Sequence, residues 1–316
     1  MSLDPKIAQL IEWTRRAARG NYSQMSPQAA REHYARAVLT LDVAPAPMVE
    51  VRDHWIELGD RSLRLRQYAP RPLSWVDPLP GLLYFHGGGF TIGSVETHDR
   101  VCRALAAGAG CQVLSLDYRL APEHRFPSAH DDAFASLDWV RNEAASLGLD
   151  AARLAVGGDS AGGTLAAATA LHARDRGIGL ALQLLIYPGT SAWQDTESHR
   201  RLANGYLLDA EVIQWFFGNY LRDDADRGDW RFAPMLAAPE GVAPAWVAVA
   251  QYDPLRDEGI EFARRLETAG VAVELVEYPG MIHAFFQHGG YVATARLAHA
   301  QASAALARAL GTRSAN

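Results

Sequence analysis

The chain has 316 residues and a mass of 34.4 kDa, with 49% apolar and 21% charged residues, which are the proportions of a globular protein. Thirty Lys and Arg against 36 Asp and Glu leave a net charge of −6, and no run of basic residues is present to follow a phosphate backbone, so we expect no nucleic-acid partner. The single lysine, Lys6, lies in the first turns of the chain, which excludes a Walker-type phosphate lysine and a Schiff-base lysine in the core.

Two helices are predicted before the hydrophobic pattern changes. Asp4 can cap the first helix, Pro5 suits its first position, and Gly20 ends it. Prolines then mark a joint, after which apolar residues alternate as in strands. The expected elements are helices over 4–20 and 26–39, a proline-rich joint over 42–47, and strands over 51–58 and 62–68.

Short apolar strands alternate with longer helices from residue 81 onward. This pattern predicts an α/β fold with a mostly parallel central sheet flanked by helices on both faces. The expected strands cover 81–85, 112–117, 153–157, 180–187, 245–250 and 271–278, and the expected helices cover 97–109, 128–146, 161–175, 257–269 and 290–310.

One segment interrupts this alternation. An aromatic-rich helix over 209–220 and a charged loop over 223–229 follow the fourth of these strands. Beside the N-terminal helices, this insertion is placed as a small helical cap over the carboxyl ends of the strands, where open parallel sheets bind ligands. The predicted division is therefore 1–45 as N-terminal cap helices, 46–189 as the first part of the core, 190–225 as the cap insertion, and 226–316 as the second part of the core.

The candidate nucleophile is Ser160, in the run GDSAGG at 158–163. The run follows the strand-like RLAV and opens a helix rich in Ala and Leu, which is the context that the G-x-S-x-G elbow requires. Small residues on either side let a strained turn lift the hydroxyl above the sheet at a helix N-terminus. The alternative is an ordinary glycine-rich turn between a strand and a helix.

A second glycine run, HGGGF at 86–90, follows the strand-like LLYF. From this position a loop can offer backbone N–H groups to a developing oxyanion. The competing interpretation is a phosphate-binding glycine loop. It does not match the dinucleotide pattern G-x-G-x-x-G, because Gly93 follows Gly89 after three residues rather than two.

A serine nucleophile needs a base and a group that orients the base. Asp253 follows the strand-like WVAVAQY, and His283 lies after VAVELVEY, so both emerge at the same sheet edge as Ser160 and in the order Ser, Asp, His. Asp257 and Glu258 are rival acids, but a place in the first turn of the next helix is sufficient to explain them.

Together, HGGGF, GDSAGG, YRLAPEHRFP at 118–127, DPLRDEG at 253–259 and the loop around His283 resemble the hormone-sensitive-lipase-like (bacterial family IV) carboxylesterases of the α/β-hydrolase fold. The resemblance covers about residues 80–310. It implies a triad, an oxyanion hole built from backbone N–H groups, no cofactor, a cap from the N-terminus plus an insertion, and a homodimer through an edge strand. The implied residues are Ser160, Asp253 and His283 for the triad and Gly88, Gly89 and Ala161 for the oxyanion hole. Gln251 departs from the pattern, since similar sequences often carry Glu or Gly there.

Other residues near these motifs receive supporting roles. Asp159 is expected to brace by hydrogen bonding, and the charged side chains Glu123, His124 and Arg125 are expected to brace the HGGGF loop. The aromatic side chains of the insertion either pack within their helix or face the mouth of the site. The residues predicted to line a substrate pocket are Phe90, Tyr206, Leu207, Trp215 and Phe216.

The sequence therefore predicts a serine carboxylesterase that hydrolyses short- to medium-chain esters through an acyl-enzyme, with a small-molecule ester as its partner. An amidase or lactonase on the same triad is the alternative, followed by a non-catalytic receptor of the same fold. No metal is expected, because no histidine pair or carboxylate cluster has ligand spacing. No apolar stretch is long enough to span a membrane. A cytoplasmic location is expected from Cys102 and Cys111, interpreted as reduced core thiols, and from the lack of a signal segment.

Overall fold

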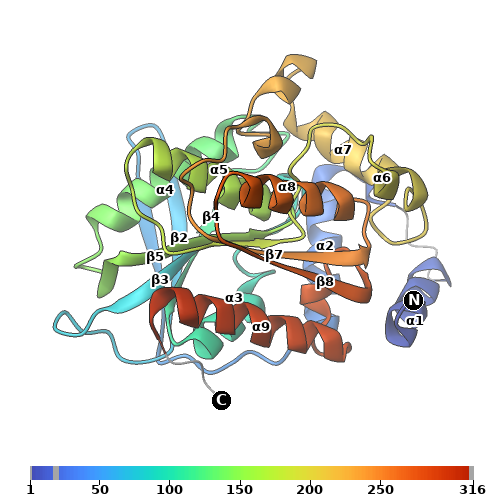
Figure 1. The fold of residues 1–316 in the computed structure, drawn as a ribbon. Helices are drawn as coiled ribbons and strands as arrows, with labels where there is room; N and C mark the ends of the chain where they lie inside the picture. The colour runs from blue at the N-terminus through green and yellow to red at the C-terminus, as the bar shows by residue number, and fades with distance from the viewer. Residues whose placement is uncertain (1, 17–20, 313–316) are drawn as a thin grey trace.

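An eight-stranded sheet forms the centre of the molecule (Figure 1), in a computed structural model that describes residues 2–16 and 21–312. The strand order is β1-β2-β4-β3-β5-β6-β7-β8; β2 is antiparallel to both of its neighbours, and all other neighbouring pairs are parallel. The predicted α/β fold with a mostly parallel sheet is confirmed. The strands are β1 Glu50–Glu57, β2 Ser62–Ala69, β3 Leu79–Phe85, β4 Gln112–Asp117, β5 Leu149–Asp159, β6 Gln183–Ile186, β7 Ala245–Tyr252 and β8 Val273–Ile282.

Helices cover both faces of this sheet. Figure 1 shows α3 and α9 together on one face and α4, α5 and α8 on the other, and each set packs on its own cluster of buried apolar side chains. Every residue of β3 is buried, as expected for a parallel strand covered on two sides. The α-helices are α1 Pro5–Arg16, α2 Pro27–Leu41, α3 Asp99–Ala109, α4 Ser128–Asn142, α5 Ala161–Asp175, α6 Glu197–Arg201, α7 Ala210–Tyr220, α8 Arg256–Thr268 and α9 Ala293–Leu310.

The predicted elements agree with the structure in kind and differ mainly at their ends. The strand expected over 180–187 is shorter at both ends: β6 begins only at Gln183, and Tyr187, which takes a positive φ of 36°, follows its last residue. Residues 17–20 of the first expected helix lie outside the described residues. The sequence missed α6 and the short 3-10 helices because three to five residues are too few for a hydrophobic period. The 3-10 helices are η1 Tyr22–Gln24, η2 Asp224–Gly228, η3 Pro234–Leu236 and η4 Phe285–His288.

The N-terminal helices and the insertion lie on the side of the sheet to which β7 and β8 point (Figure 1). The backbone N–H of Asp4, just before α1, donates to the carbonyl of Gly280 in β8 at 3.1 Å. The segment η1 packs on α7, so the N-terminal part and the insertion touch each other. The N-terminal part and the insertion therefore lie at the end of the sheet from which the predicted site residues emerge.

Among the described residues, no helix is long and apolar enough to cross a bilayer.

Helix α2 ends on a buried carboxyl group. One oxygen of Asp42 accepts a hydrogen bond from the N–H of Val43 at 2.7 Å, and the other is buried without a partner among the described residues. Burial raises the pKa of Asp42 from 3.8 to about 6. Because the folded protein binds the proton more tightly than the unfolded chain, the carboxyl group stabilises the fold only when protonated.

We therefore predict that Asp42→Asn stabilises the protein above pH 6 and leaves its stability unchanged below pH 4. The wild type loses stability as the pH rises through the folded pKa, by at most about 3 kcal/mol for a rise in pKa from 3.8 to about 6, whereas the amide does not ionise. Thermal unfolding from pH 3.5 to 8 measures this difference. The exposed Glu240→Gln is the control, and a constant gap between Asp42→Asn and wild type across this range would contradict the assignment.

Candidate active site

Ser160 occupies a strained turn between β5 and α5. Its φ of 55° and ψ of −122° fall where an L-residue is rarely found. A hydrogen bond from its backbone N–H to the carbonyl of Ile186, at 2.9 Å, ties the turn to the next strand. Such strain persists only where the surrounding structure enforces it, and the turn leaves the Ser160 side chain partly exposed.

The small residues around Ser160 are required by close packing. A β-carbon on Gly162 would lie 2.0 Å from the carbonyl oxygen of Phe85 at the end of β3. Helix α5 therefore begins in direct contact with the neighbouring strand, which only glycine allows. The predicted elbow geometry is present in the structure.

A continuous hydrogen-bonded chain joins the three residues predicted as a triad. Nδ1 of His283 lies 2.6 Å from Oδ2 of Asp253, and Nε2 lies 2.9 Å from Oγ of Ser160. Because a carboxylate only accepts, Nδ1 carries the proton and Nε2 is left to accept from the serine hydroxyl. Asp253 is fully buried, and its second oxygen accepts from the N–H of Leu255 at 2.9 Å.

The sheet explains how residues so distant in sequence meet. Strands β7 and β8 are parallel neighbours, and Tyr252 pairs with Ile282. Asp253 and His283 are therefore the next residues after a paired position, at the same edge at which β5 delivers Ser160. The Asp253 and His283 positions follow from strand register rather than from local sequence.

The HGGGF loop lies beside the nucleophile elbow, since a β-carbon on Gly162 would be 2.7 Å from the carbonyl oxygen of His86. Gly88 and Gly89 have φ values of 121° and 56°, a conformation that favours glycine. The carbonyl of Gly88 faces away, since it accepts from the N–H groups of Thr91 and Ile92. Within residues 2–16 and 21–312, no acceptor binds the N–H of Gly88 or Gly89, and the N–H of Ala161 is at the start of α5, where a helix leaves donors unused.

Asp159 holds the glycine loop by hydrogen bonds, as predicted. Its fully buried carboxylate accepts from the hydroxyl of Tyr84 at 2.7 Å and from the N–H of Gly87 at 3.0 Å. Burial acts to raise the pKa of Asp159, but the neighbouring His98 and the hydrogen bond from the Tyr84 hydroxyl outweigh it, so the pKa lies below its ordinary value. The nucleophile elbow and the glycine loop are thus fixed to each other.

The loop YRLAPEHRFP also braces the HGGGF loop, but the prediction named the wrong atoms. The Tyr118 hydroxyl donates to the carbonyl of His86 at 2.8 Å, and the two rings stack. The charged side chains instead reach the N-terminal helices and the insertion: Glu123 pairs with Arg31 of α2, and Arg125 donates to carbonyls near the end of α7. Sequence spacing gave no signal for these long-range partners.

The five residues predicted to line a pocket occupy different surroundings. Phe216 of α7 lies against the glycine loop, since a β-carbon on Gly89 would be 2.2 Å from its ring. Trp215 packs beside Phe216, with ring centroids 5.2 Å apart. By contrast, Phe90 is almost fully buried and stacks on Tyr220 at 4.1 Å in an aromatic cluster.

The remaining two lie near the end of β7. The Tyr206 ring stacks on Tyr252 at 5.4 Å, directly before Asp253. Leu207 is partly buried and takes a positive φ of 72°. Of the five, Phe216 has the most direct contact with the predicted oxyanion loop.

A buried contact between a carboxylate and an imidazole, which the sequence did not predict, anchors the insertion. Glu258, expected only as a first-turn residue of α8, lies 3.2 Å from Nε2 of His199 in α6 and accepts from the N–H groups of Thr190 and Ser191. Gln251, the position that departs from the resemblance, accepts from the N–H of Gly280 at 2.8 Å. Neither contact has a local sequence signal, because the partners are 29 or more residues apart.

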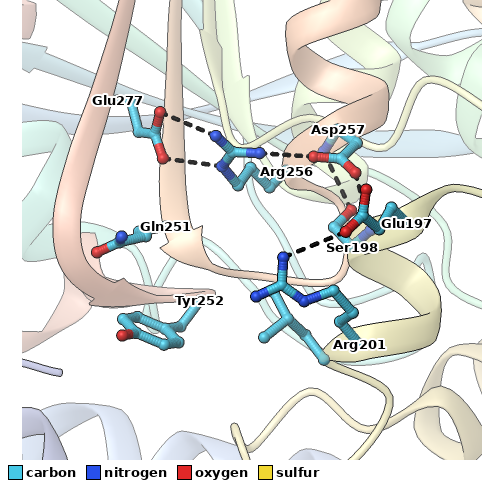
Figure 2. A pocket seen from close by; sticks show the side chains of 9 residues that line it. Glu197, Ser198, Arg201, Gln251, Tyr252, Arg256, Asp257 and Glu277 are labelled. Atoms are coloured by element: carbon cyan, nitrogen blue, oxygen red, sulfur yellow. Dashed lines mark hydrogen bonds and ion pairs between the residues drawn. The ribbon is translucent and has the colours of Figure 1, made fainter. Parts of the chain in front are cut away.

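A separate cavity of about 320 Å³ lies between α6, the end of β7 and the start of α8 (Figure 2). Its charges are paired within its own wall: Arg256 binds Glu277 and Asp257, and Arg201 binds Glu197. No residue of the predicted triad or oxyanion hole lines it. The cavity therefore lies at the interface between the insertion and the core, apart from the predicted active site.

Comparison with known proteins agrees with this geometry. Residues 82–287 match a family model described as the alpha/beta hydrolase fold. The chain is 40% identical to an ethyl acetate hydrolase of Pseudomonas putida over 301 residues, covering 92% of this chain and 94% of that one. It is 44% identical to the carboxylesterase NlhH of Mycobacterium tuberculosis over 240 residues, covering 74% and 75%.

Solved structures give the same result. An ester hydrolase from the metagenome of Lake Arreo, complexed with a bipyridine phosphonate derivative, superposes with a TM-score of 0.94 at 40% identity, covering 98% of this chain and all of that one. The chain belongs to the α/β-hydrolase fold family. This confirms the family that the sequence motifs predicted.

We predict that Asp253→Asn lowers kcat for ester hydrolysis about 10⁴-fold, because an amide imposes the wrong tautomer on His283. Asp257→Asn should have a far smaller effect, since Asp257 binds Arg256 and the N–H of Ser198 rather than the histidine. Steady-state kinetics on a soluble ester measures both. If the two effects were reversed, Asp257 would be the acid of the triad.

Proposed function

We propose that this protein is a serine carboxylesterase that hydrolyses short- to medium-chain esters through an acyl-enzyme. The observation that supports it most is the hydrogen-bonded chain from Ser160 through His283 to Asp253, set at a strained elbow beside unused backbone donors. Relatives named carboxylesterase and ethyl acetate hydrolase support the same reaction class.

In the first half-reaction, Oγ of Ser160 attacks the ester carbonyl carbon while Nε2 of His283 takes the hydroxyl proton. The carbonyl oxygen becomes an oxyanion, and the N–H groups of Gly88, Gly89 and Ala161 stabilise it. The intermediate then collapses, the bond to the alcohol oxygen breaks, and His283 returns the proton to the leaving alcohol.

Water completes the cycle in the second half-reaction. It attacks the acyl carbon as His283 takes one of its protons, and the second oxyanion occupies the same donors. Collapse breaks the bond to Oγ of Ser160, which regains its proton from His283, and the carboxylic acid leaves. Throughout, Asp253 holds the imidazole in the required tautomer and stabilises its cation.

Chain-length preference is proposed to come from the N-terminal helices and the insertion acting as a cap. Phe216 of α7 against Gly89 supports a roof over the acyl site. Each methylene buried under such a roof gains about 0.8 kcal/mol until the roof is reached. The ethyl acetate hydrolase named among the relatives acts on a short ester, which supports the short end of the range.

Ser160→Ala should abolish turnover, with a loss of order 10⁶ in kcat, because a triad acts as a unit. Its thermal unfolding should stay near that of the wild type. Ser146→Ala is the matched control, since Ser146 is an exposed serine before the start of β5, at the opposite end from Ser160. Undiminished ester hydrolysis by Ser160→Ala would refute the proposed nucleophile.

Across p-nitrophenyl esters, we predict that kcat/KM rises from acetate to an optimum at about four to eight acyl carbons and then falls steeply. Replacing Phe216 with Ala should move the optimum to longer chains by removing the ring that lies over the oxyanion loop. Leu236→Ala, at an exposed site, is the control. Equal cleavage of palmitate and butyrate by the wild type would count against a bounded acyl pocket.

Two finer assignments complete the proposal. A cytoplasmic location is supported by the free, buried thiols of Cys102 and Cys111, where burial raises the pKa of Cys111 to about 12. A homodimer is proposed through β8, which ends the sheet order and carries the exposed Leu275.

A further inference from the structure

One buried imidazole joins four separate parts of the chain. His98, directly before α3, is fully buried. The groups around its Nε2 come from the glycine loop, from the nucleophile elbow and from η4, and η4 is in turn bonded to α2. Three of these segments carry or adjoin the proposed catalytic groups. No step of the proposed reaction uses His98 itself.

The two nitrogens of His98 have distinct partners. Nδ1 lies 2.9 Å from Oγ1 of Thr97. Nε2 lies 3.3 Å from the backbone N of Gly87, whose N–H donates to it. It also lies 3.3 Å from a carboxylate oxygen of Asp159, a contact without a hydrogen bond, because a nitrogen that accepts has no proton to donate. His98 therefore touches the loop that would hold the oxyanion and the residue next to the nucleophile.

Gln287 connects this imidazole to the N-terminal helices. Its amide nitrogen lies 2.8 Å from Nε2 of His98, and its amide oxygen accepts from the hydroxyl of Tyr34 at 2.7 Å. Gln287 is 2% exposed and follows His283 by four residues. Tyr34 is in α2, 253 residues away in sequence, so the connection is made only by the fold.

A second contact holds α2 against the same loop from outside. Arg31, one helical turn before Tyr34, donates to the carbonyls of Thr91 and Ala121 at 2.9 and 2.8 Å. Residues three apart share a helix face, so one face of α2 meets the glycine loop twice. Arg31 contacts the carbonyl of Thr91 directly. Tyr34 is connected to Gly87 of the same loop through Gln287 and His98.

We propose that Tyr34 and Gln287 are positioning residues for ester hydrolysis, forming a bridge through His98 that keeps the oxyanion loop aligned with the nucleophile elbow. The proposal rests on the proposed function and adds to it a role for α2 beyond roofing the pocket. The bridge acts on the donors of the oxyanion hole, which stabilise charge only in the transition state. Its loss should therefore lower kcat and leave KM unchanged.

Tyr34→Phe, Gln287→Met and the double variant test this bridge. Tyr34→Phe removes one oxygen atom and keeps the ring, and methionine is close in shape to glutamine. With p-nitrophenyl butyrate we expect each single variant to lose about fivefold in kcat, the scale of one neutral hydrogen bond, with KM within twofold of the wild type. The double variant should lose no more than either single one, because both break the same connection.

A trifluoromethyl ketone with the same acyl chain supplies a second measurement. It forms a tetrahedral adduct with the serine, so its inhibition constant should rise by the factor by which kcat/KM falls. Hydrogen exchange supplies a third that needs no turnover. Residues 84–92 should exchange faster in both variants, because the loop is less firmly held.

Tyr278→Phe is the matched control. The hydroxyl of Tyr278 in β8 donates to the amide oxygen of Gln301 in α9 at 2.6 Å, which is the same kind of bond away from the glycine loop. This variant should keep the wild-type kcat and the wild-type exchange at 84–92. If Gln287→Met does not fold, Tyr34→Phe against Tyr278→Phe decides alone.

The bridge would be overturned if Tyr34→Phe kept the wild-type kcat and the wild-type exchange at residues 84–92, or if the losses of kcat multiplied in the double variant. An effect of Tyr34→Phe or Gln287→Met on KM alone would also overturn it. So would a loss of kcat in Tyr278→Phe equal to that in Tyr34→Phe. Failure of the proposed function is a different result. In that case the wild type hydrolyses no ester, while the exchange of residues 84–92 still shows whether Tyr34 and Gln287 hold the loop.

Discussion

The close approach of α5 to the end of β3 is the constraint on which the site depends. Because Gly162 lies against the carbonyl of Phe85, with no room for a β-carbon, the chain must leave β5 through a sharp turn. That turn forces Ser160 to a positive φ, at a cost of about 1–3 kcal/mol for such a residue. The hydrogen bond from Ser160 to Ile186 and the buried start of α5 offset this strain, and the hydroxyl is held where His283 can reach it.

Two buried carboxylates then have different roles near the serine. Asp253 orients the histidine, whereas Asp159 takes the N–H of Gly87 and the hydroxyl of Tyr84 and so fixes the glycine loop. Each is satisfied by several donors, which is how a buried charge is tolerated. The nucleophile, its base and the backbone donors are consequently parts of one hydrogen-bonded unit rather than three independent groups.

Much of this unit could be predicted from sequence, because the elbow has a local motif and the strand pattern indicates which residues follow the ends of parallel strands. The elbow needs glycines next to Ser160, and parallel strands deliver Asp253 and His283 to one edge. The contacts of the N-terminal helices and the insertion could not be predicted, because they pair residues with no shared local pattern. The contacts of Arg31 with Thr91 and of His199 with Glu258 join residues that are far apart in sequence and close only in the folded protein. Phe90 is likewise buried because it stacks on Tyr220 of α7, a partner that lies 130 residues later in the sequence.

In the proposed mechanism, Ser160 carries the acyl group during turnover. The direct measurement is acid quenching of the enzyme within milliseconds of mixing with p-nitrophenyl butyrate, followed by mass spectrometry of its peptides. We expect a butyryl group on the peptide that contains Ser160, in amounts that rise and then decay as substrate is consumed. An acyl group on another residue, or complete hydrolysis with no acylated peptide under conditions of burst release, would contradict it.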